Sequence, residues 1–429
     1  MKKKKPNLLV LGASGGVANA FLHYLSGYRD NLFGKLVLLD KNSKILKNCS
    51  IDHKVLNYRF LHKKIDLPKK SRYKVKNLRL QKELGEKEYL DILKDNKIDI
   101  VLDITDANTL EILEATNKAG VSYINTAMND DKKTTDELIF DIYPRKNKLK
   151  NAPHILCAGM NPGNVNMWAR YGIEKFGMPK QIIHFEFDTS MIAKKWHSIT
   201  TWSIREFIVE AVKDPSGIAL GRRKIKHLFP NALENRENMK SILEPIMKLK
   251  KYPEGITVLH EENVSMSYKY DIPSKFIYAI FPKTLENLIK IYEKKGKISK
   301  KDLILGDNIR EALDGADNVG VLLDYPDKKV YYFNSIPNAA VIGTNSTYTQ
   351  VVVGIFSAIF TLLVDKLNPG VYFTEDLFDA HYKYFMFDNM RVQESVFKKN
   401  KGNLKLVKYN PEIKLKRSKS DRFERFCII

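Results

Sequence analysis

The stretch that decides the fold is residues 7–18, Asn-Leu-Leu-Val-Leu-Gly-Ala-Ser-Gly-Gly-Val-Ala. Its first five residues form a short apolar run, which predicts a buried strand of a parallel sheet. The glycine-rich turn that follows leads into residues 19–28, whose apolar spacing is helical. Such a turn between a first strand and a helix lets the backbone approach a pyrophosphate and places the phosphates at a helix N-terminus.

The next apolar run, residues 35–40, ends in an acid, Asp40, which lies 28 residues after Gly12. An acid at this position hydrogen-bonds the ribose hydroxyls of NAD and repels the extra phosphate of NADP. The pattern therefore predicts NAD as the cofactor, and the alternative is a tight turn that binds no ligand. The predicted cofactor-binding residues of this segment are Gly12, Ser14, Gly15, Gly16, Val17 and Asp40.

The rest of the chain divides by its pattern of elements. Strands and helices alternate over residues 1–150, which predicts an α/β fold with a doubly wound parallel sheet of the Rossmann type. Residues 151–345 contain several strands with few helices between them, which predicts an α+β domain. Residues 346–396 return to helix, and their apolar run is too short to span a bilayer, so it predicts a buried helix. Residues 397–429 are rich in lysine and predict a basic, mobile tail.

The charge of the chain is strongly positive but does not indicate a nucleic-acid site. Its 429 residues include 72 Lys and Arg against 50 Asp and Glu, a formal net charge of +22. Of the cations 57 are Lys and 15 are Arg, the residue usually chosen for bidentate recognition of phosphates and bases. We therefore predict no specific nucleic acid and no membrane, with weak polyanion binding left open.

Cysteines are few and widely spaced. The chain has 3 of them, and their spacing forms neither a disulfide framework nor a zinc pattern. We predict no metal site and a reducing, cytoplasmic compartment.

Several short segments of the second domain carry residues suited to a cationic substrate. A tryptophan face attracts a cation, carboxylates anchor ammonium groups, and a histidine can relay a proton near neutral pH. Each piece alone has a structural alternative, as a core tryptophan, a buried histidine or a solvated acid. The segments are Asn161-Pro162-Gly163, Thr201-Trp202-Ser203 with Glu210, His260 to Ser265, and Glu186 with Asp188.

Taken together, these segments resemble the bacterial type of homospermidine synthase, a relative of saccharopine dehydrogenase. The resemblance runs over about residues 7–390 and includes Gly159–Gly163, Thr201–Ser203 and His260–Ser265 in that order. It implies a Rossmann domain, a domain for catalysis and dimerisation over residues 151–345, and a helical return to the first domain over residues 346–396. The implied reaction joins two putrescines into homospermidine, releases ammonia, and uses NAD to take and return a hydride.

The resemblance also implies roles for single residues. Trp202 would stabilise the cationic substrate through its ring, and His260 would help in proton transfer. The implied carboxylates of the polyamine site are Glu186, Glu210 and Glu262.

Two further residues are implied at the border with the cofactor. Asn161 would orient an amine or the nicotinamide amide, and Asp106 would place an acid at the mouth of the site. Both are predicted to take part in catalysis and in cofactor binding.

The sequence departs from the family at Asn125 and Asn129, where acids are typical, and in the segment 276–282, which lacks histidines. These changes could redirect the enzyme to another amine such as spermidine, or weaken it. One alternative function is a reductase of the saccharopine or carboxynorspermidine dehydrogenase type, which reduces an imine between an amine and an oxo acid. It would need a cation for the substrate carboxylate, and the candidates Arg205, Arg222 and Arg223 lie outside the matched motifs. The other alternative is a non-enzymatic NAD-binding scaffold.

Overall fold

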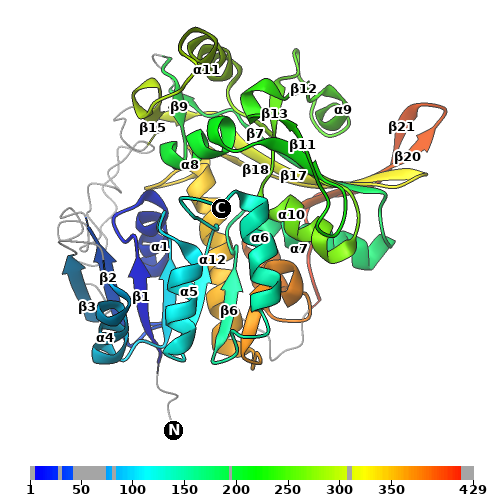
Figure 1. Ribbon diagram of the computed structural model, residues 1–429. Helices are drawn as coiled ribbons and strands as arrows, with labels where there is room; N and C mark the ends of the chain where they lie inside the picture. The colour runs from blue at the N-terminus through cyan, green and yellow to red at the C-terminus, as the bar shows by residue number, and fades with distance from the viewer. Residues whose placement is uncertain are drawn as a thin grey trace.

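The computed structural model of the chain describes residues 5–27, 31–41, 74–79, 84–192, 196–306 and 312–416. These residues form two large sheets, one below and one above in the view of Figure 1. The lower sheet has seven strands, all parallel, and the upper sheet has ten strands and is mostly antiparallel. The predicted fold class, a doubly wound parallel sheet joined to an α+β unit, is confirmed.

The parallel sheet has the strand order β19-β6-β5-β4-β1-β2-β3. Because β1 lies between β2 and β4, the chain runs outward from it in both directions, and ligands of such sheets bind beside the carboxyl ends of the strands at this point. Its strands are β1 (Asn7–Leu11), β2 (Lys35–Asp40), β3 (Lys74–Arg79), β4 (Ile100–Asp103), β5 (Ser122–Asn125), β6 (Pro153–Leu156) and β19 (Gly370–Phe373).

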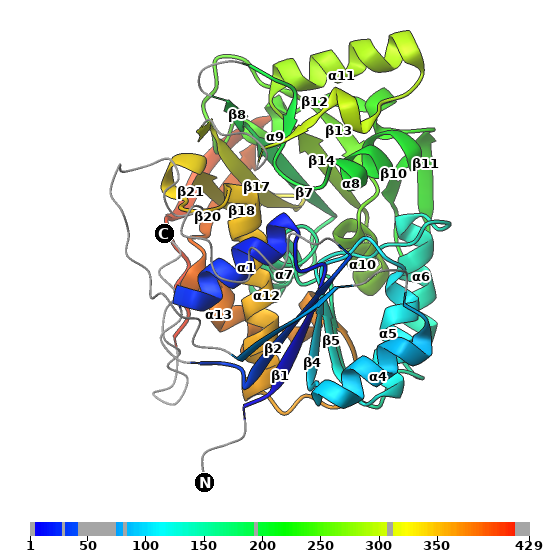
Figure 2. The same cartoon turned by 90° about the vertical axis from the view of Figure 1, so that its left-hand side faces the viewer.

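Helices cover both faces of the parallel sheet, as Figure 2 shows. Side chains of a strand alternate between the faces, so Leu8 and Val10 enter one core while Leu9 and Leu11 enter the other. The first core is closed by α1 (Gly16–Gly27), α12 (Ser346–Val364) and α13 (Tyr382–Asn389). The second core is closed by α4 (Glu86–Asn96), α5 (Thr109–Lys118) and α6 (Thr135–Arg145).

The upper sheet has the order β11-β10-β14-β7-β17-β18-β20-β21, with β13 also paired to β14 and β12 paired to β13. Its strands are β7 (Gln181–Asp188), β10 (Ser216–Ala219), β11 (Ile225–Phe229), β12 (Arg236–Asn238), β13 (Glu254–Val258), β14 (Ser274–Ala279), β17 (Ala316–Asp324), β18 (Lys328–Pro337), β20 (Gln393–Asn400) and β21 (Asn403–Asn410). The helices that pack near it are α7 (Asn164–Phe176), α8 (Ile204–Ile208), α9 (Lys240–Leu243), α10 (Glu261–Tyr270) and α11 (Pro282–Lys295). Four short strands complete the described strands: β8 (Met191–Ile192), β9 (Ile199–Thr200), β15 (Ile304–Leu305) and β16 (Leu313–Asp314).

The central helix α12 confirms the prediction of a buried helix in this region. By length and composition it could cross a membrane, but 78% of its most apolar window is buried inside the protein. It packs against α1 and against the turn after β6. At that turn the backbones come so close that a Cβ on Gly354 would overlap the carbonyl oxygen of Gly159.

The predicted domain boundaries need two corrections. Strand β6 lies beyond residue 150, yet it pairs with β5 and belongs to the parallel sheet. The segment 346–396 does return to the first domain, but it also contributes β19, which pairs with β6. The short run 370–373 was missed because four residues carry too little periodicity to predict a strand.

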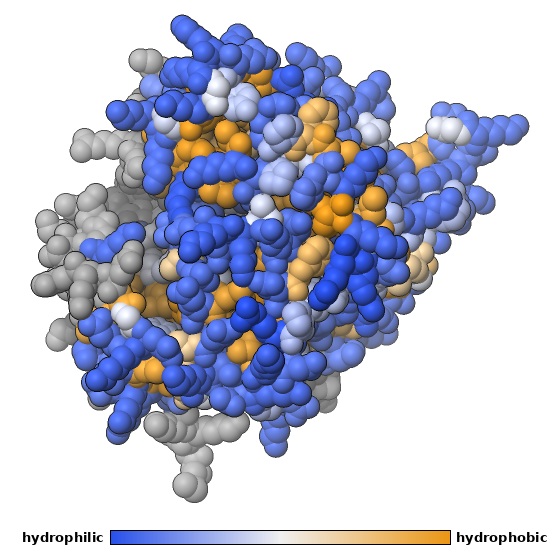
Figure 3. All heavy atoms as spheres, in the orientation of Figure 1, coloured by the Kyte–Doolittle hydropathy of each residue, from blue (hydrophilic) through white to orange (hydrophobic). Residues whose placement is uncertain are grey.

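The prediction of a mobile tail from residue 397 is wrong for the part that the structure describes. Residues 393–400 and 403–410 form the hairpin β20–β21, which projects from the body of the protein and shows a mainly hydrophilic surface (Figures 1 and 3). Lysines are common on edge strands, where they point to solvent, and one of them, Lys399, pairs with Asp324 at 2.6 Å. Residues 417–429 of the predicted tail lie outside the described residues.

We predict that Gly354→Ala destabilises the protein. The added methyl group meets backbone atoms that cannot rotate away, and overpacking of this kind costs about 1–3 kcal/mol. The midpoint of urea unfolding should therefore fall. Gly27→Ala is the matched helical control, because a Cβ at Gly27 meets no atom of the described residues within 4 Å. An unchanged midpoint for Gly354→Ala would contradict the close packing of α12.

Candidate functional site

The glycine turn after β1 lies at the carboxyl ends of the parallel strands. Gly12 has a φ of +75°, and a Cβ on it would sit 2.6 Å from the carbonyl oxygen of Ile104, which follows β4. The amide of Gly12 donates to the carbonyl of Leu39 on β2 at 3.1 Å. The turn therefore threads between β2 and β4, and only glycine has both the conformation and the size that this path requires.

The glycines at the start of α1 serve two different purposes. Gly15 closes the turn by donating its amide to the carbonyl of Gly12 at 3.0 Å. A Cβ on Gly16 would overlap the ring of Tyr348, so this glycine allows α12 to pack against the first turn of α1. Val17 faces the same core. The N-terminus of α1 is thus held in place. Its first backbone N–H groups have no partner within the helix, and such groups bind anions.

Asp40, at the end of β2, closes the turn from the other side. Its Oδ2 accepts hydrogen bonds from the backbone amide of Ser14 at 2.9 Å and from the hydroxyl of Ser14 at 2.7 Å. The predicted acid and the predicted serine are therefore brought together. The carboxylate fixes the shape of the loop in addition to any role toward a ribose.

Asp106 lies at the border between the two domains, one residue after Thr105, whose methyl group would be 3.2 Å from a Cβ on Gly12. The side chain of Asp106 is half exposed and pairs with Arg205 of α8 at 2.6 Å. Arg205 also reaches Asp131 at 2.7 Å and so connects the first domain to the second. The sequence had offered Arg205 only as a residue outside the matched motifs, and its position directly after Thr201–Ser203 was the available signal.

The predicted departures Asn125 and Asn129 organise the backbone near this border. Asn125 is buried and bonds the amide of Cys157 and the carbonyl of Ala127. Asn129 donates to the carbonyl of Thr105 at 3.2 Å.

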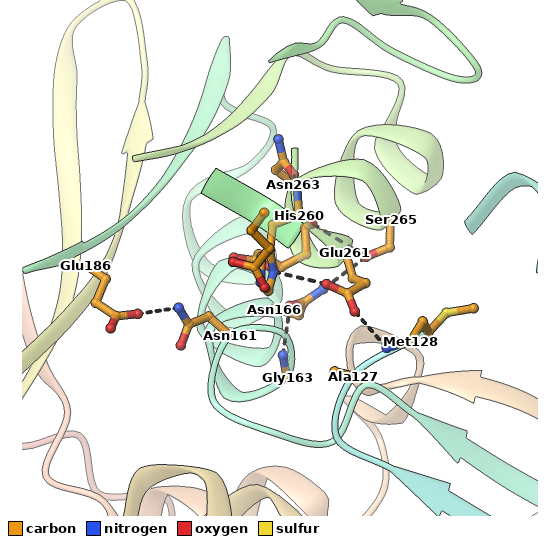
Figure 4. Close-up of polar contacts among 12 residues, drawn as sticks. Ala127, Met128, Asn161, Gly163, Asn166, Glu186, His260, Glu261, Asn263 and Ser265 are labelled. Carbon is orange, nitrogen blue, oxygen red and sulfur yellow. Dashed lines mark hydrogen bonds and ion pairs between the residues drawn. The ribbon is translucent and has the colours of Figure 1, made fainter. Parts of the chain in front are cut away.

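The second part of the site lies on one face of the upper sheet. The alternation of β7 puts His184, Glu186 and Asp188 on the same face, while Phe185 and Phe187 enter the core on the other side. Glu186 accepts a hydrogen bond from the side-chain amide of Asn161 at 2.5 Å (Figure 4). Burial, followed by the charges of the neighbouring acids, raises the pKa of Glu186 well above its usual value.

A histidine surrounded by carboxylates begins α10. His260 is the residue before the first helical turn, and its Nδ1 contacts Glu262 and also Glu261, the latter at 3.1 Å. Its Nε2 lies 3.3 Å from Glu210, which lies in the π-helical turn Val209–Lys213 directly after α8. Acids at the start of a helix are favoured by the helix dipole. Figure 4 labels His260 and Glu261 and shows the hydrogen bond, 2.7 Å long, that the backbone amide of Met128 in the first domain donates to Glu261.

The protonation of this group follows from its contacts. Burial would lower the pKa of His260, but the charges of Glu262, Glu210 and Glu261 outweigh it and raise the pKa well above the usual value. Burial would raise the pKa of Glu262, and the charge of His260 outweighs it and lowers that pKa. Burial raises the pKa of Glu261, and the charge of His260 and the hydrogen bond from the Met128 amide offset this only in part. The ligand atoms of His260, Glu261 and Glu262 lie within 4.8 Å of one another, a spacing that a metal could also use, and the direct ring–carboxylate contacts account for it as an ion-pair network.

Trp202 completes the group. Its indole N–H donates to the hydroxyl of Tyr278 at 2.9 Å, and Tyr278 lies opposite Glu186 in the sheet. This bond fixes the plane of the indole beside the carboxylates. The structure therefore gathers Asn161, Glu186, Trp202, Glu210, His260 and Glu262, and it pairs Asp106 with Arg205 of α8.

Three buried residues of the site were missed. His184 has neither ring nitrogen hydrogen-bonded among the described residues, and burial lowers its pKa to about 4. Glu261 connects His260 to the first domain. Asp317 lies opposite Asp188 on β17. An acid within an apolar strand is costly unless it is compensated, and this was the signal that could have singled out Asp317.

Comparison with known proteins shows two similar solved structures. The chain resembles homospermidine synthase from Legionella pneumophila in complex with NAD, with a TM-score of 0.67 and 16% identity over 90% of this chain and 88% of that chain. It also resembles saccharopine dehydrogenase (L-Glu forming) from Saccharomyces cerevisiae, with a TM-score of 0.55 and 11% identity over 91% of this chain and 99% of that chain. No model of a protein family and no curated protein matches the sequence. At these identities the similarity shows a common fold.

We predict that His260→Gln destabilises the protein by about 3 kcal/mol, because it leaves buried carboxylates without their cation. The folded-state pKa of His260 is raised, so its stabilisation is complete below the unfolded pKa of about 6.5 and is lost as the pH rises through the folded value. The difference in unfolding free energy between wild type and variant should become smaller as the pH rises through the folded-state pKa of His260. Chemical denaturation at a series of pH values measures it.

His227→Gln is the control, because the ring of His227 is half exposed and solvent screens its contact with Asp136, which is 3.5 Å long. Exposed pairs contribute little. A pH-independent difference for His260→Gln would contradict a charged His260.

Proposed function

We propose that the protein is an NAD-dependent enzyme of the homospermidine synthase type, which joins two diamines with release of ammonia. The observation that carries the proposal is the group formed by the buried Glu186, Glu262 and His260 with the partly buried Glu210 and Trp202. It combines carboxyl groups with an indole held in place, and these are the groups that recognise ammonium.

The residues of the first domain fit NAD. The turn at Gly12 leaves no room for a side chain, so the backbone can approach a pyrophosphate. The N-terminus of α1 follows this turn and suits a phosphate, and Asp40 ends β2, where an acid can bind the ribose. When bound, NAD would accept a hydride from one amine and return it to the new imine, so that the reaction has no net oxidation. The presence of NAD in the similar structure from Legionella pneumophila supports this assignment.

The chain's own residues would then bind and orient the amines. Trp202 offers its ring face to a cation, and the bond to Tyr278 keeps the ring from turning. Glu186 holds the amide of Asn161, so that Asn161 can present its carbonyl oxygen to an amine or to the cofactor amide. His260, set between Glu210 and Glu262, is placed to hold a proton close to the substrate.

The substrates, the oligomeric state, the location and the partners are part of the same proposal. We propose putrescine as the substrate, with spermidine as a second donor or acceptor, a homodimer, and a cytoplasmic location. We propose no membrane partner and no specific nucleic acid, and only weak binding of polyanions by the lysine-rich surface.

A second candidate function rests on Arg205. This guanidinium stands at the border of the two domains, where it could hold the carboxylate of an oxo acid in a reductase of the saccharopine dehydrogenase type. The charge of Arg205 is already paired with Asp106 and Asp131, so it is less available for a substrate carboxylate. This favours the diamine substrate over the oxo acid.

The test is incubation of the purified protein with putrescine and NAD, with the products identified by mass spectrometry. Homospermidine and ammonia without accumulation of NADH support the proposal. Turnover of an amine with an oxo acid and NADH instead would support the reductase. Binding of NAD without turnover of either would support a scaffold.

We predict that Trp202→Ala lowers turnover at least about tenfold, because a desolvated cation–π contact contributes about 2 kcal/mol. Affinity for NAD, measured by calorimetry, should not change. Trp202→Phe, which keeps a ring but loses the bond to Tyr278, should retain more activity than the alanine variant. Equal activity of wild type and Trp202→Ala would remove Trp202 from the site.

We also predict that Asp40→Ala weakens NAD binding and narrows the difference in affinity between NAD and NADP. The change removes a charge and both acceptor contacts to Ser14. Asp40→Asn keeps an acceptor oxygen and should mainly affect the discrimination, and Ser14→Ala tests the loop contact alone. Unaltered affinities for both cofactors in Asp40→Ala would exclude Asp40 from the cofactor site.

A further inference from the structure

Three carboxyl groups of the upper sheet are buried together without a cation. Glu186 and Asp188 lie on one face of β7, and Asp317 lies opposite Asp188 on β17. Each is less than 5% exposed. No described lysine, arginine or histidine forms an ion pair with any of the three. Since buried carboxylates must be compensated, protons must take the place of the missing cation.

A chain of hydroxyl groups connects two of these acids. Oδ2 of Asp317 contacts the hydroxyl of Thr347 at 2.8 Å, and the hydroxyl of Thr347 contacts that of Thr201 at 2.9 Å. The hydroxyl of Thr201 reaches Oδ2 of Asp188 at 2.7 Å. Asn345 holds the strand end and the helix start together by donating to the carbonyl of Thr201 and accepting from the amide of Tyr348.

The protons in this chain can be counted. Three contacts join the four groups, and each contact needs one proton, but the two threonine hydroxyls supply only two. One of the two acids must therefore be protonated. Glu186 is the diagonal neighbour of Asp317 on the same face of β7 and β17, and burial, followed by the charge of Asp317, raises the pKa of Glu186 well above its usual value, so Glu186 holds a second proton. The three acids thus hold two protons and one negative charge.

The negative charge belongs at the Asp188 end. Oδ1 of Asp188 accepts from the backbone amide of Ser190 at 2.8 Å, which favours its ionised form. Oδ1 of Asp317 is buried with no other donor among the described residues. Burial, followed by the charge of Asp188, raises the pKa of Asp317 to about 8. The hydrogen bonds of the chain can then all point the same way, from Asp317 through Thr347 and Thr201 to Asp188, with Glu186 beside Asp317 at the start.

We propose that this chain is a proton relay that takes the proton from the substrate ammonium at Glu186 and delivers it to Asp188. The inference rests on the proposed function, in which an ammonium group must become a neutral amine before it can react. Asp188, Thr201, Asp317 and Thr347 act through Glu186 and are positioning residues.

The step balances. An N–H bond of the ammonium breaks and an O–H bond forms on Glu186. Each proton along the chain moves to the next oxygen, and the last one forms an O–H bond on Asp188. The substrate changes from +1 to neutral and the chain from one negative charge to none. The same path in reverse returns the proton to the product amine.

The groups that face Asp317 determine its titration. Those that titrate are Glu186 and Asp188 on β7 and Tyr278 on β14. The groups from α12 and β18 are neutral: Thr347, Gln350 and Asn334. His260 adds a positive charge near Glu186.

The test is Thr347→Val, which keeps the shape of the side chain and removes the central hydroxyl. We expect kcat for putrescine to fall by about 10²-fold, the lower end of what a positioned acid–base group contributes, with KM nearly unchanged. The solvent deuterium isotope effect on kcat should rise, because proton delivery becomes slow. A smaller folded fraction would lower kcat without altering this isotope effect, so a merely structural role is distinguished.

Thr361→Val is the matched control. Thr361 is buried in the same helix, and within the part of the chain that the structure describes its hydroxyl bonds only the carbonyl of Ser357. We expect wild-type kinetics for this variant. Wild-type kcat and isotope effect in Thr347→Val would overturn the relay.

Infrared spectroscopy of the protein without substrate tests the relay independently of the proposed enzymatic function. A band of protonated carboxyl groups should be present at neutral pH, should titrate at about 8 and should weaken in Asp317→Asn. Absence of this band overturns the relay whatever the enzyme does with amines. If the band is present but wild type converts no amine, the proposed function fails and the relay role fails with it.

Discussion

The tight packing of α12 is the constraint on which the rest of the structure depends. This helix packs against α1 and against the turn after β6, and at both contacts a glycine removes the side chain that would keep the two segments apart. At the start of α1, the absence of a side chain on Gly16 leaves room for the ring of Tyr348. On α12, the absence of a side chain on Gly354 leaves room for the carbonyl of Gly159. The dinucleotide turn and the turn that carries Asn161 both pack against α12, so this helix sets the distance between the two turns.

The N-terminal end of α12 then reaches the buried acids. Asn345 caps the helix and holds the carbonyl of Thr201, while Thr347 bonds Asp317. A helix that is apolar for most of its length thus begins with polar residues where it meets the site. Packing and chemistry are joined in one element, which explains why the chain returns to the first domain after building the second.

The electrostatics of the site are opposite to those of the whole chain. A net charge of +22 comes from lysines at the surface, such as those of the hairpin β20–β21, whereas the face of the upper sheet gathers acids. Local potential decides which ligand binds, and the net charge mainly affects long-range steering. The acids are tolerated in the interior by two different means. His260 neutralises part of the group at α10, and shared protons neutralise part of the group at Asp317.

The sequence by itself determined the elements whose pattern is local. The glycine turn, the acid at the end of β2, the buried helix and the motifs around Asn161, Trp202 and His260 could be predicted because each depends on the spacing of neighbouring residues. Their gathering could not, because Glu186 and Asp317 are brought together by strand register over more than a hundred positions. Strand pairing also decided that β6 and β19 join the first sheet, and the placement of α8 beside the loop after β4 decided that Asp106 faces Arg205. Only the tertiary structure settles such pairings, since the free energy of a buried charge depends on what the fold places beside it.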